Sequence, residues 1–278
     1  MKTLRTVAEI RRVLDPFRQS SRIALVPTMG ALHAGHVALF HAARQAADVV
    51  AASIFINPSQ FGDPRDLAEY PRAEAKDESI ASEAGVDFVF APAVEELYPA
   101  GYATWVHVDG AALGLEGEHR PGHFRGVATV CLKLFTVVMP DVAFFGQKDA
   151  QQVAVVRQVV RDLNVAVDIR VVPIVRDADG LALSSRNSRL SAEERTRALA
   201  IPRALDAGLA AYRNHRDPVA AARAVLAGPV SAGNIDGIDV DYVAVAEFDG
   251  QPTLAIAARV GRTRLIDNVP LVIEGRSS

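Results

Sequence analysis

Hydrophobic and polar positions form two kinds of block along the first 176 residues. Short, continuously apolar runs, which are typical of strands, alternate with longer segments in which apolar residues recur at helical spacing. The runs predict strands over 22–28, 49–57, 86–92, 104–109, 141–146 and 167–175, and the longer segments predict helices over 35–48, within 64–84, and over 126–138 and 149–164. Because the runs are apolar at successive positions, we expect the strands to be covered on both faces, as in a parallel sheet.

The pattern changes after about residue 176. An alanine- and arginine-rich stretch over 191–216 predicts helix, and the runs "VDYVAVAEFDG" and "RTRLIDNVPLV" predict strands of a small sheet. The predicted fold class is therefore α/β, with a doubly wound (Rossmann-like) parallel sheet over residues 1–176 and a smaller C-terminal α+β domain over 177–278. At the other end, residues 1–20 carry apolar positions at helical spacing and predict an amphipathic helix.

Composition narrows the classes of function. The chain has 278 residues, 50% of them hydrophobic, which is ample for a large core, and a net charge of −3, which gives no general attraction for nucleic acid. The most apolar stretch, 127–145, is interrupted by Lys133 and by Pro140-Asp141, so it predicts a buried helix, a turn and a buried strand rather than a membrane span. The charged N-terminus does not resemble a secretory signal. The single Cys131 can form neither an internal disulfide nor a cysteine zinc site, which favours the cytoplasm.

Polar segments follow several of the predicted strands. In open parallel sheets, ligands bind outside the carboxyl ends of the strands. Three such segments are "PTMGALHAGH" (27–36), "NPSQFG" (57–62) and "GQKDAQQ" (146–152), and a fourth, "DGLALSSRNSRLS" (179–191), lies at the predicted domain junction. The first opens a helix, whose free N–H groups and positive dipole end would face the same place. We expect the fold to bring the four segments together.

The side chains in these segments favour a phosphate-bearing substrate. His33 and His36 are neighbours on one helical face. Lys148 and Arg186 add positive charge, and "NPSQFG" adds neutral amides. No covalent nucleophile with a nearby base stands out. This set of cationic and amide side chains suits a reaction whose transition state gains negative charge on oxygen.

The same residues also have structural interpretations. A histidine at a helix start usually caps the helix or faces solvent, and a single lysine there is usually solvated. The loop "SSRNSR" is compatible with a hydrophilic connection that ends at Ser191, because "SAEE" resembles a capping box. Cys131, flanked by Val130 and Leu132, is interpreted as a core residue.

The motifs together resemble a known family. "HAGH" and "LSSR" resemble the two ATP-binding motifs of the nucleotidyltransferase superfamily, which includes the class I aminoacyl-tRNA synthetases. The fuller set "VPTMGALHAGH", "SIFINPSQFG", "YPR", "RPGHFRGVATV", "FFGQKDAQQ" and "DGLALSSRN", which runs from about residue 25 to 190, resembles the pantoate–β-alanine ligase family. The C-terminal domain carries no specific motif.

This resemblance implies a two-step reaction with ATP and Mg²⁺. The pantoate carboxylate attacks the α-phosphate of ATP and gives pantoyl adenylate and pyrophosphate, and the amine of β-alanine then displaces AMP to give pantothenate. The adenylate stays noncovalently bound, in agreement with the missing nucleophile. The resemblance also implies a homodimer and a C-terminal domain that closes over the active site.

The resemblance also implies a role for each matching residue. The catalytic residues would be His36, which stabilises or protonates the leaving pyrophosphate, with His33, Lys148 and Arg186. Gln60, Asn57 and Gln152 would hold pantoate, and Gln60 would lie near β-alanine. Arg120 and His123 would lie on a covering loop. The implied ATP-binding residues are Met29, Gly30, Ala31, Leu32, His33, Ala34, Gly35, His36, Gly146, Gln147, Lys148, Asp149, Val175, Leu183, Ser184, Ser185 and Arg186.

Within that set, Gly146 and Asp149 would take the ribose, and Val175 would touch the adenine by its backbone. Ser184 and Ser185 would close over the phosphates with Arg186. Three positions depart from the family pattern. Gln147 stands where glutamate is frequent, Ala150 where a larger residue is common, and Leu183 where methionine is usual. Leucine for methionine nearly conserves volume.

Three alternative functions remain open at this point. A nucleotidyltransferase that moves AMP or CMP to another small acceptor would share "HAGH", but it leaves the amides of "NPSQFG" unexplained. A metallohydrolase would use His33 and His36 with a third ligand from His119, His123 or Asp149, although nearby cations oppose a dication. A nonenzymatic nucleotide-binding module is the third. We expect no metal ligated by the protein alone.

Overall fold

The computed structural model describes residues 1–227 and 237–272 and divides the chain into two compact units. The first consists of Met1–Gln147 and Gln151–Pro173. The second consists of Lys148–Ala150 and the chain from Ile174 onward. The three residues Lys148–Ala150 are thus grouped with the second unit, although the residues on either side of them belong to the first.

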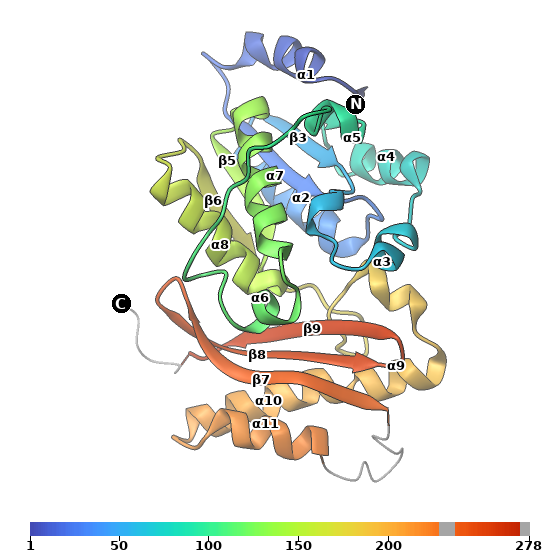
Figure 1. The fold of residues 1–278 in the computed structure, drawn as a ribbon, viewed down its shortest axis with the longest axis vertical. Helices are drawn as coiled ribbons and strands as arrows, with labels where there is room; N and C mark the ends of the chain where they lie inside the picture. Colours follow the sequence, from blue (N-terminus) through green and yellow to red (C-terminus); the bar gives the residue numbers. More distant parts are fainter. Residues whose placement is uncertain (228–236, 273–278) are drawn as a thin grey trace. The chain divides into compact units, whose positions relative to one another are not determined.

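The first unit is built on a six-stranded parallel sheet with the order β1-β4-β3-β2-β5-β6 (Figure 1). Its strands are β1 (Lys2–Leu4), β2 (Ile23–Thr28), β3 (Val49–Ile54), β4 (Phe88–Phe90), β5 (Val142–Gly146) and β6 (Asp168–Val172). From β2 the chain builds outward through β3 and β4, and it then returns to the other side of β2 with β5. The predicted doubly wound sheet is confirmed, and its topological switch point lies between β2 and β5, where ligands of such sheets bind.

Helices cover both faces of this sheet, as the continuous apolar runs predicted. One face carries Leu25, Ala51 and Phe90 and packs against α1, α7 and α8, and the other carries Val26 and Val50 and packs against α2 and α4. Those helices are α1 (Val7–Leu14), α2 (Ala34–Ala46), α4 (Glu74–Glu83), α7 (His123–Val138) and α8 (Ala150–Asp162). Fully buried side chains such as Phe40 and Phe90 each stabilise the fold by about 1.5–3 kcal/mol.

Three shorter helices complete the first unit: α3 (Pro64–Ala68), α5 (Val94–Leu97) and α6 (Leu115–His119). The helix predicted within 64–84 is therefore two helices, α3 and α4, with "YPR" between them. The N-terminal helix is shorter than predicted, because Lys2–Leu4 pairs with β4 and Thr6 then caps α1 in a capping box with Glu9.

The strand predicted over 104–109 is wrong, since these residues belong to no strand. The interpretation of 127–145 as buried helix, turn and buried strand is confirmed, and Cys131 lies in the core. Among residues 1–227 and 237–272, no helix has the length and apolar character that a membrane crossing requires.

The second unit packs helices against a three-stranded antiparallel sheet of order β7-β8-β9. Its elements are α9 (Ala192–Ala198), α10 (Ala200–Arg213), α11 (Pro218–Ala227), β7 (Ile238–Phe248), β8 (Gln251–Val260) and β9 (Thr263–Pro270). Gly208 of α10 allows close packing on β8, because a Cβ there would lie 2.2 Å from Leu254 Cδ2. The small C-terminal sheet is confirmed, as is the capping box of Ser191 with Glu194, while β8 and α11 were not predicted.

Candidate active site

The loop between β2 and α2 is fixed by a buried carboxylate. Asp77 of α4, with 2% of its surface exposed, accepts hydrogen bonds from the backbone N–H of Ala31 (2.9 Å) and of Leu32 (2.7 Å). Gly30 and Ala31 both have positive φ, of 79° and 52°. A Cβ on Gly30 would lie 2.8 Å from Asp77 Oδ2. The loop therefore needs glycine at this position both for its backbone conformation and for the approach of the carboxylate.

His33 and His36 form an unusual cap at the start of α2. The Nδ1 atom of His33 accepts from the N–H of Gly35 (3.1 Å), and the Nδ1 atom of His36 accepts from the N–H of His33 (3.2 Å). The two ring centroids lie 4.2 Å apart. Because both Nδ1 atoms accept, the proton of each neutral ring sits on Nε2. The capping interpretation is therefore confirmed, with both Nδ1 atoms hydrogen-bonded to the backbone.

A buried pair of amides lies beside this loop. Asn57 caps the short 3₁₀ helix Pro58–Gln60, and Gln60 is its last residue; their surfaces are 1% and 7% exposed. Asn57 Nδ2 donates to Gln60 Oε1 (3.0 Å) and to the carbonyl of Gly126 (3.1 Å). Gln60 Nε2 lies 3.2 Å from the sulfur of Met29. The fold thus brings "NPSQFG" into contact with the β2–α2 loop, as the sequence predicted.

The motif "RPGHFRG" supports these amides from α7. His123 Nδ1 lies 3.0 Å from the carbonyl oxygen of Gln60, and His123 Nε2 lies 3.1 Å from a guanidinium nitrogen of Arg120. Since Arg120 can only donate, Nε2 accepts and Nδ1 donates to Gln60. A Cβ on Gly126 would lie 2.5 Å from the carbonyl oxygen of Ser59. This part of the motif is therefore packed against the amide turn.

The two adjacent glutamines of α8 behave differently. Gln151 is buried, accepts from the N–H of Glu116 (3.0 Å), and donates to the carbonyls of Ala111, Leu113 and Gly114 at 3.1–3.2 Å. It therefore anchors the loop before α6. Its neighbour Gln152 is only half-buried. The family resemblance implied that Gln152 is a site residue, but nothing in the sequence indicated that Gln151 holds the loop before α6 in place.

In the second unit, the residues that follow β5 lie near a buried ion pair. Lys148 Nζ lies 3.7 Å from a carboxylate oxygen of Asp149, and Asn268 Nδ2 donates to the carbonyl of Lys148 (2.9 Å). Next to Asn268, Asp267 accepts two hydrogen bonds from Arg176, at 2.7 and 3.0 Å. Burial raises the pKa of Asp267, and the paired guanidinium opposes that shift.

The segment from Val175 to Arg186 forms a turn that is closed by hydrogen bonds near both of its ends. The N–H of Leu183 donates to the carbonyl of Val175 (3.0 Å), and Ser184 Oγ accepts from the N–H of Arg186 (3.3 Å). Arg195 holds the turn by donating to Asp177 (2.6 Å) and Asp179 (2.8 Å). The hydrogen bond from Arg195 lowers the pKa of Asp179. Ser184 caps the 3₁₀ helix Ser185–Arg189.

The predicted site residues thus fall on both units. Met29, Asn57 and Gln60 form one hydrogen-bonded group at the carboxyl ends of β2 and β3, and His33 and His36 start the helix that follows the same loop. Gly146 ends the neighbouring strand β5, and Gln147 follows it. Lys148, Asp149, Val175 and Leu183–Arg186 belong to the second unit. Sequence reasoning missed Asp77, since a lone acidic residue on a helix gives no signal of its partner loop.

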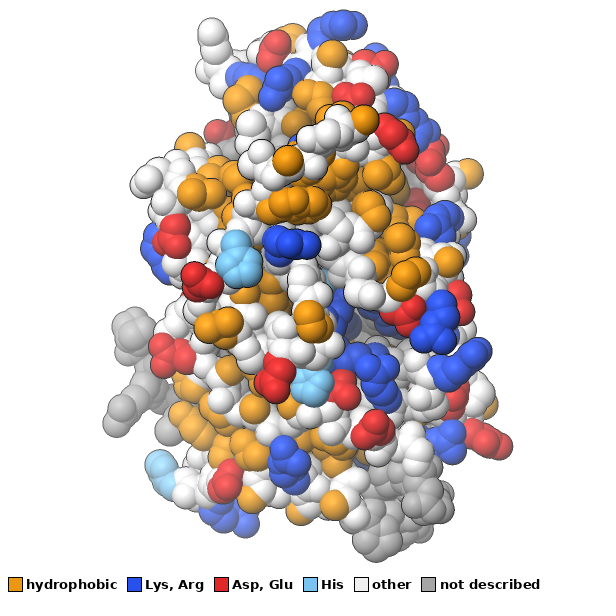
Figure 2. All heavy atoms as spheres, in the orientation of Figure 1, with side chains coloured by type: hydrophobic (Ala, Val, Ile, Leu, Met, Phe, Trp, Pro, Cys, Tyr) orange, Lys and Arg blue, Asp and Glu red, His pale blue; other side chains and the backbone are white. Residues whose placement is uncertain are grey.

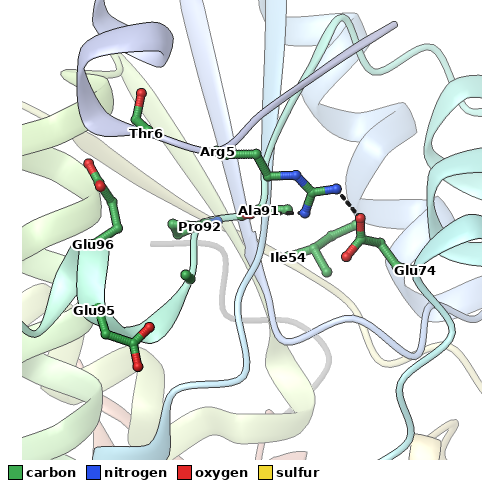
Figure 3. Close-up of a pocket in the computed structure, with 9 residues that line it drawn as sticks. Arg5, Thr6, Ile54, Glu74, Ala91, Pro92, Glu95 and Glu96 are labelled. Atoms are coloured by element: carbon green, nitrogen blue, oxygen red, sulfur yellow. Dashed lines mark hydrogen bonds and ion pairs between the residues drawn. The ribbon is translucent and has the colours of Figure 1, made fainter.

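A separate cavity lies at the far edge of the sheet. It has a volume of about 660 Å³ and contains none of the predicted residues. Figure 3 shows Arg5 pointing across it toward Glu74, to which it is ion-paired. Its lining consists of Arg5, Thr6, Ile54, Glu74, Ala91, Pro92, Ala93, Glu95 and Glu96. Because the lining comes from the ends of β1, β3 and β4 and from the starts of α4 and α5, the cavity is offset from the switch point between β2 and β5.

Comparison with known proteins gives one family. The model of the pantoate–β-alanine ligase family matches residues 2–270. Pantothenate synthetase from Moorella thermoacetica is 50% identical over 98% of this chain and 99% of that protein. The homologous enzyme from Sphingopyxis alaskensis is 48% identical over 98% of this chain and 100% of that protein.

Comparison with solved structures points to the same family. The crystal structure of pantothenate synthetase from Thermus thermophilus matches with a TM-score of 0.90 at 42% identity, covering 98% of this chain and 99% of that one. A pantoate–β-alanine ligase from Francisella tularensis, crystallised in complex with β-γ ATP and β-alanine, matches with a TM-score of 0.81 at 31% identity, covering 98% of both chains.

Proposed function

This chain belongs to the pantoate–β-alanine ligase family, and from that premise we propose how its own residues carry the reaction. It is a ligase that condenses pantoate with β-alanine. In the proposed route, a pantoate carboxylate oxygen forms a bond to the α-phosphorus of ATP while the bond to the β-phosphate oxygen breaks. The amine of β-alanine then attacks the acyl carbon, AMP leaves with both electrons of the acyl–oxygen bond, and the amine gives up a proton.

The observation that carries this proposal is the group formed by the β2–α2 loop and the buried amides. This group lies beside the switch point, where ligands of such sheets bind. It places a helix N-terminus, which attracts phosphate, next to neutral amides, which suit the uncharged hydroxyl groups of an acceptor such as pantoate. A phosphorylated acceptor would instead favour cations there. This difference supports an acid–amine ligase over a nucleotidyltransferase with a phosphorylated acceptor.

In the first unit, the histidine cap would bind the triphosphate. The backbone groups of Met29–His36 and the positive end of α2 attract anions. The Nε2–H of His36 would donate to the leaving pyrophosphate, with His33 beside it, because both Nδ1 atoms are already hydrogen-bonded to the backbone. Asn57 and Gln60 would orient pantoate for in-line attack, with Gln152 as a third contact.

In the second unit, Lys148 and Arg186 would neutralise charge as pyrophosphate departs. Ser184 and Ser185 would close over the phosphates, Val175 and Leu183 would line the adenine, and Asp149 would take the ribose together with Gly146. The C-terminal domain, proposed to cover residues 177–278, would close over bound ATP and exclude water from the adenylate.

Magnesium would enter as part of the ATP substrate. Mg²⁺ usually binds substrate phosphate oxygens with few protein ligands. Among residues 1–227 and 237–272, the structure has no cluster of three or more His, Cys, Asp or Glu side chains arranged for a metal ion. We also propose that the enzyme is a cytoplasmic homodimer.

The test is product analysis. ATP is incubated with the enzyme alone, with pantoate, and with pantoate and β-alanine, and the nucleotide products are separated. The proposal expects AMP in amounts equal to pantothenate, only when both substrates are present. ADP formation, or AMP release that needs no pantoate, would reject the adenylate route.

A further inference from the structure

His123 is a buried polar residue to which the proposed reaction assigns no role. It is the first residue of α7, and Figure 2 shows hydrophobic side chains gathered on the face of the first unit that carries this helix in Figure 1. Only 6% of its surface is exposed. Its Nδ1 lies 3.0 Å from the carbonyl oxygen of Gln60, and its Nε2 lies 3.1 Å from a guanidinium nitrogen of Arg120. His123 is therefore in direct contact with a residue proposed to hold pantoate.

The side-chain amide of Asn57 can take only one orientation. Its Oδ1 accepts from the backbone N–H of Ser59 (3.3 Å) and from Ser59 Oγ (2.8 Å). Its Nδ2 donates to the carbonyl of Gly126 (3.1 Å) and to Gln60 Oε1 (3.0 Å). A backbone N–H can only donate and a carbonyl can only accept, so exchanging the two ends of the amide would break both backbone contacts. Asn57 thus uses all of its hydrogen-bonding positions within the protein.

The orientation of Asn57 fixes the amide of Gln60 as well. The end of this amide that faces Asn57 Nδ2 must accept, so it is Oε1, and Nε2 is the end that lies 3.2 Å from the sulfur of Met29. Sulfur is a weak acceptor, and it takes one of the two hydrogens of Nε2. Within residues 1–227 and 237–272, the other hydrogen has no acceptor. Gln60 therefore offers an N–H donor beside the β2–α2 loop, which suits an oxygen atom of pantoate.

The backbone of Gln60 is held by His123. In the part of the chain that the structure describes, no backbone N–H donates to the carbonyl oxygen of Gln60, which accepts from His123 instead. Because Arg120 can only donate, Nε2 of His123 accepts and the proton of the neutral ring sits on Nδ1. Arg120 in turn lies 3.8 Å from the carboxylate of Glu116, a residue with 5% of its surface exposed. This chain of groups keeps the ring in the tautomer that donates to Gln60.

We propose that His123 is a positioning residue for the ligase reaction, which holds Gln60 where its N–H reaches pantoate. The inference rests on the proposed role of Gln60. Asn57 sets which end of the Gln60 amide faces the substrate, and His123 sets where the backbone that carries this amide lies. Because a misplacement of about 1 Å can cost about 10²-fold in rate, a hydrogen bond to that backbone can matter as much as a direct contact with the substrate.

Two amide variants separate the two nitrogen positions of the ring. Counted in bonds from Cβ, the amide nitrogen of asparagine stands where Nδ1 stands, and the amide of glutamine stands where Nε2 stands. His123→Asn therefore keeps a donor for Gln60, whereas His123→Gln keeps only a partner for Arg120. We expect His123→Gln to lower kcat/KM for pantoate about 10- to 100-fold and His123→Asn to lower it no more than about threefold. Pantoate-dependent exchange of labelled pyrophosphate into ATP measures both values.

Thermal unfolding serves as the control for this pair. Each variant replaces the ring by one amide and loses one of the two hydrogen bonds, so the two melting temperatures should fall by similar amounts. A role of His123 in folding alone predicts equal losses of activity in the two variants, whereas a positioning role predicts unequal ones. Equal values of kcat/KM for His123→Asn and His123→Gln would overturn the proposal.

A double variant shows whether the effect passes through Gln60. Gln60→Ala removes the positioned amide, so adding His123→Gln should lower kcat/KM for pantoate by no more than about twofold further. A further loss as large as in the wild-type background would contradict the proposal. If Gln60→Ala alone uses pantoate like the wild type, the proposed role of Gln60 fails and the inference fails with it. An impaired Gln60→Ala beside two equally active histidine variants rejects the inference alone.

The proton on Nδ1 gives a spectroscopic test. In nuclear magnetic resonance spectra of enzyme labelled with ¹⁵N-histidine, the signals of His123 are identified by their absence in His123→Asn. They should show a protonated Nδ1 and an unprotonated Nε2. His33 and His36 should show the opposite tautomer, because their Nδ1 atoms accept hydrogen bonds. A His123 ring that carries its proton on Nε2 would overturn the proposal.

Discussion

The β2–α2 loop and the turn Val175–Arg186 are both assigned to ATP, yet they are held in opposite ways. The first is fixed by the buried carboxylate of Asp77 and lies against the buried amides Asn57 and Gln60. The second is held by Arg195, whose side chain is 35% exposed, and by a serine cap. Buried hydrogen bonds are costly to break, whereas exposed ion pairs contribute little. The comparison indicates that the β2–α2 loop, here called the platform, is held more firmly than the turn Val175–Arg186, here called the proposed cover.

The largest effect is expected from removing a positive charge of the second unit. Lys148→Ala should lower kcat about 10²- to 10³-fold, because the lysine stabilises charge that develops as pyrophosphate leaves. Its melting temperature should be unchanged, since Lys148 contacts Asn268 through its backbone carbonyl. Pantoate-dependent exchange of labelled pyrophosphate into ATP measures the activity. An exchange rate equal to that of the wild type would remove Lys148 from the mechanism, and His36→Ala serves as the parallel test for the platform.

The platform should lose stability as well as activity when its carboxylate is removed. Asp77→Ala leaves the N–H groups of Ala31 and Leu32 without their acceptor, which should cost about 2–4 kcal/mol of unfolding free energy. Asp77→Asn keeps one acceptor oxygen and is the matched control, with a smaller loss. Urea unfolding and ATP binding are measured on both. If Asp77→Ala unfolds like the wild type, the platform is not held by this residue.

The neighbouring glutamines offer a sharper contrast. Gln151→Ala removes four hydrogen bonds of a buried side chain and should reduce stability by about 1–3 kcal/mol, with effects on activity that follow the fold. Gln152→Ala should instead raise the KM for pantoate about tenfold at unchanged melting temperature. Steady-state kinetics and thermal unfolding separate the two. The reverse pattern would exchange their roles.

The sequence already contained most of the fold, and the exceptions have physical causes. The apolar runs of β2, β3 and β5 and the helices between them were predictable because they are buried on both faces. The three residues of β1 were hidden inside an amphipathic pattern, and β8 escaped notice although it is the central strand of its sheet. Residues 104–109 have the composition of a strand, but a strand needs a neighbour, and composition does not supply one.

The candidate site was predictable only in part. The motifs gave the residues that would face substrates, including the histidines and the amides. They did not give Asp77, whose partner loop lies 46 residues away along the chain, because such contacts are set by the tertiary fold. Likewise, nothing local distinguishes Gln151 from Gln152 until the helix α8 is placed against its surroundings.

The smallest effect is expected at the exposed pairs of the cover. Arg195→Ala should change unfolding free energy by no more than about 1 kcal/mol and raise the KM for ATP only a few-fold. Arg195 lowers the pKa of Asp179 in the folded state, so the pair stabilises the fold above the pKa of the unfolded carboxyl and loses that effect as the pH falls. The difference between variant and wild type should therefore begin to shrink below about pH 4, where the carboxyl of the unfolded chain takes up a proton, and vanish once the pH lies below the lowered pKa of the folded Asp179. A difference that grows on acidification would contradict this assignment.

The central claim, that the carboxylate of pantoate attacks the α-phosphate of ATP, can be followed atom by atom. Pantoate labelled with ¹⁸O in its carboxylate is converted with ATP and β-alanine, and the products are analysed by mass spectrometry. Attack at the α-phosphorus followed by displacement at the acyl carbon transfers one ¹⁸O atom into each AMP. Unlabelled AMP, or ADP together with labelled inorganic phosphate, would contradict it.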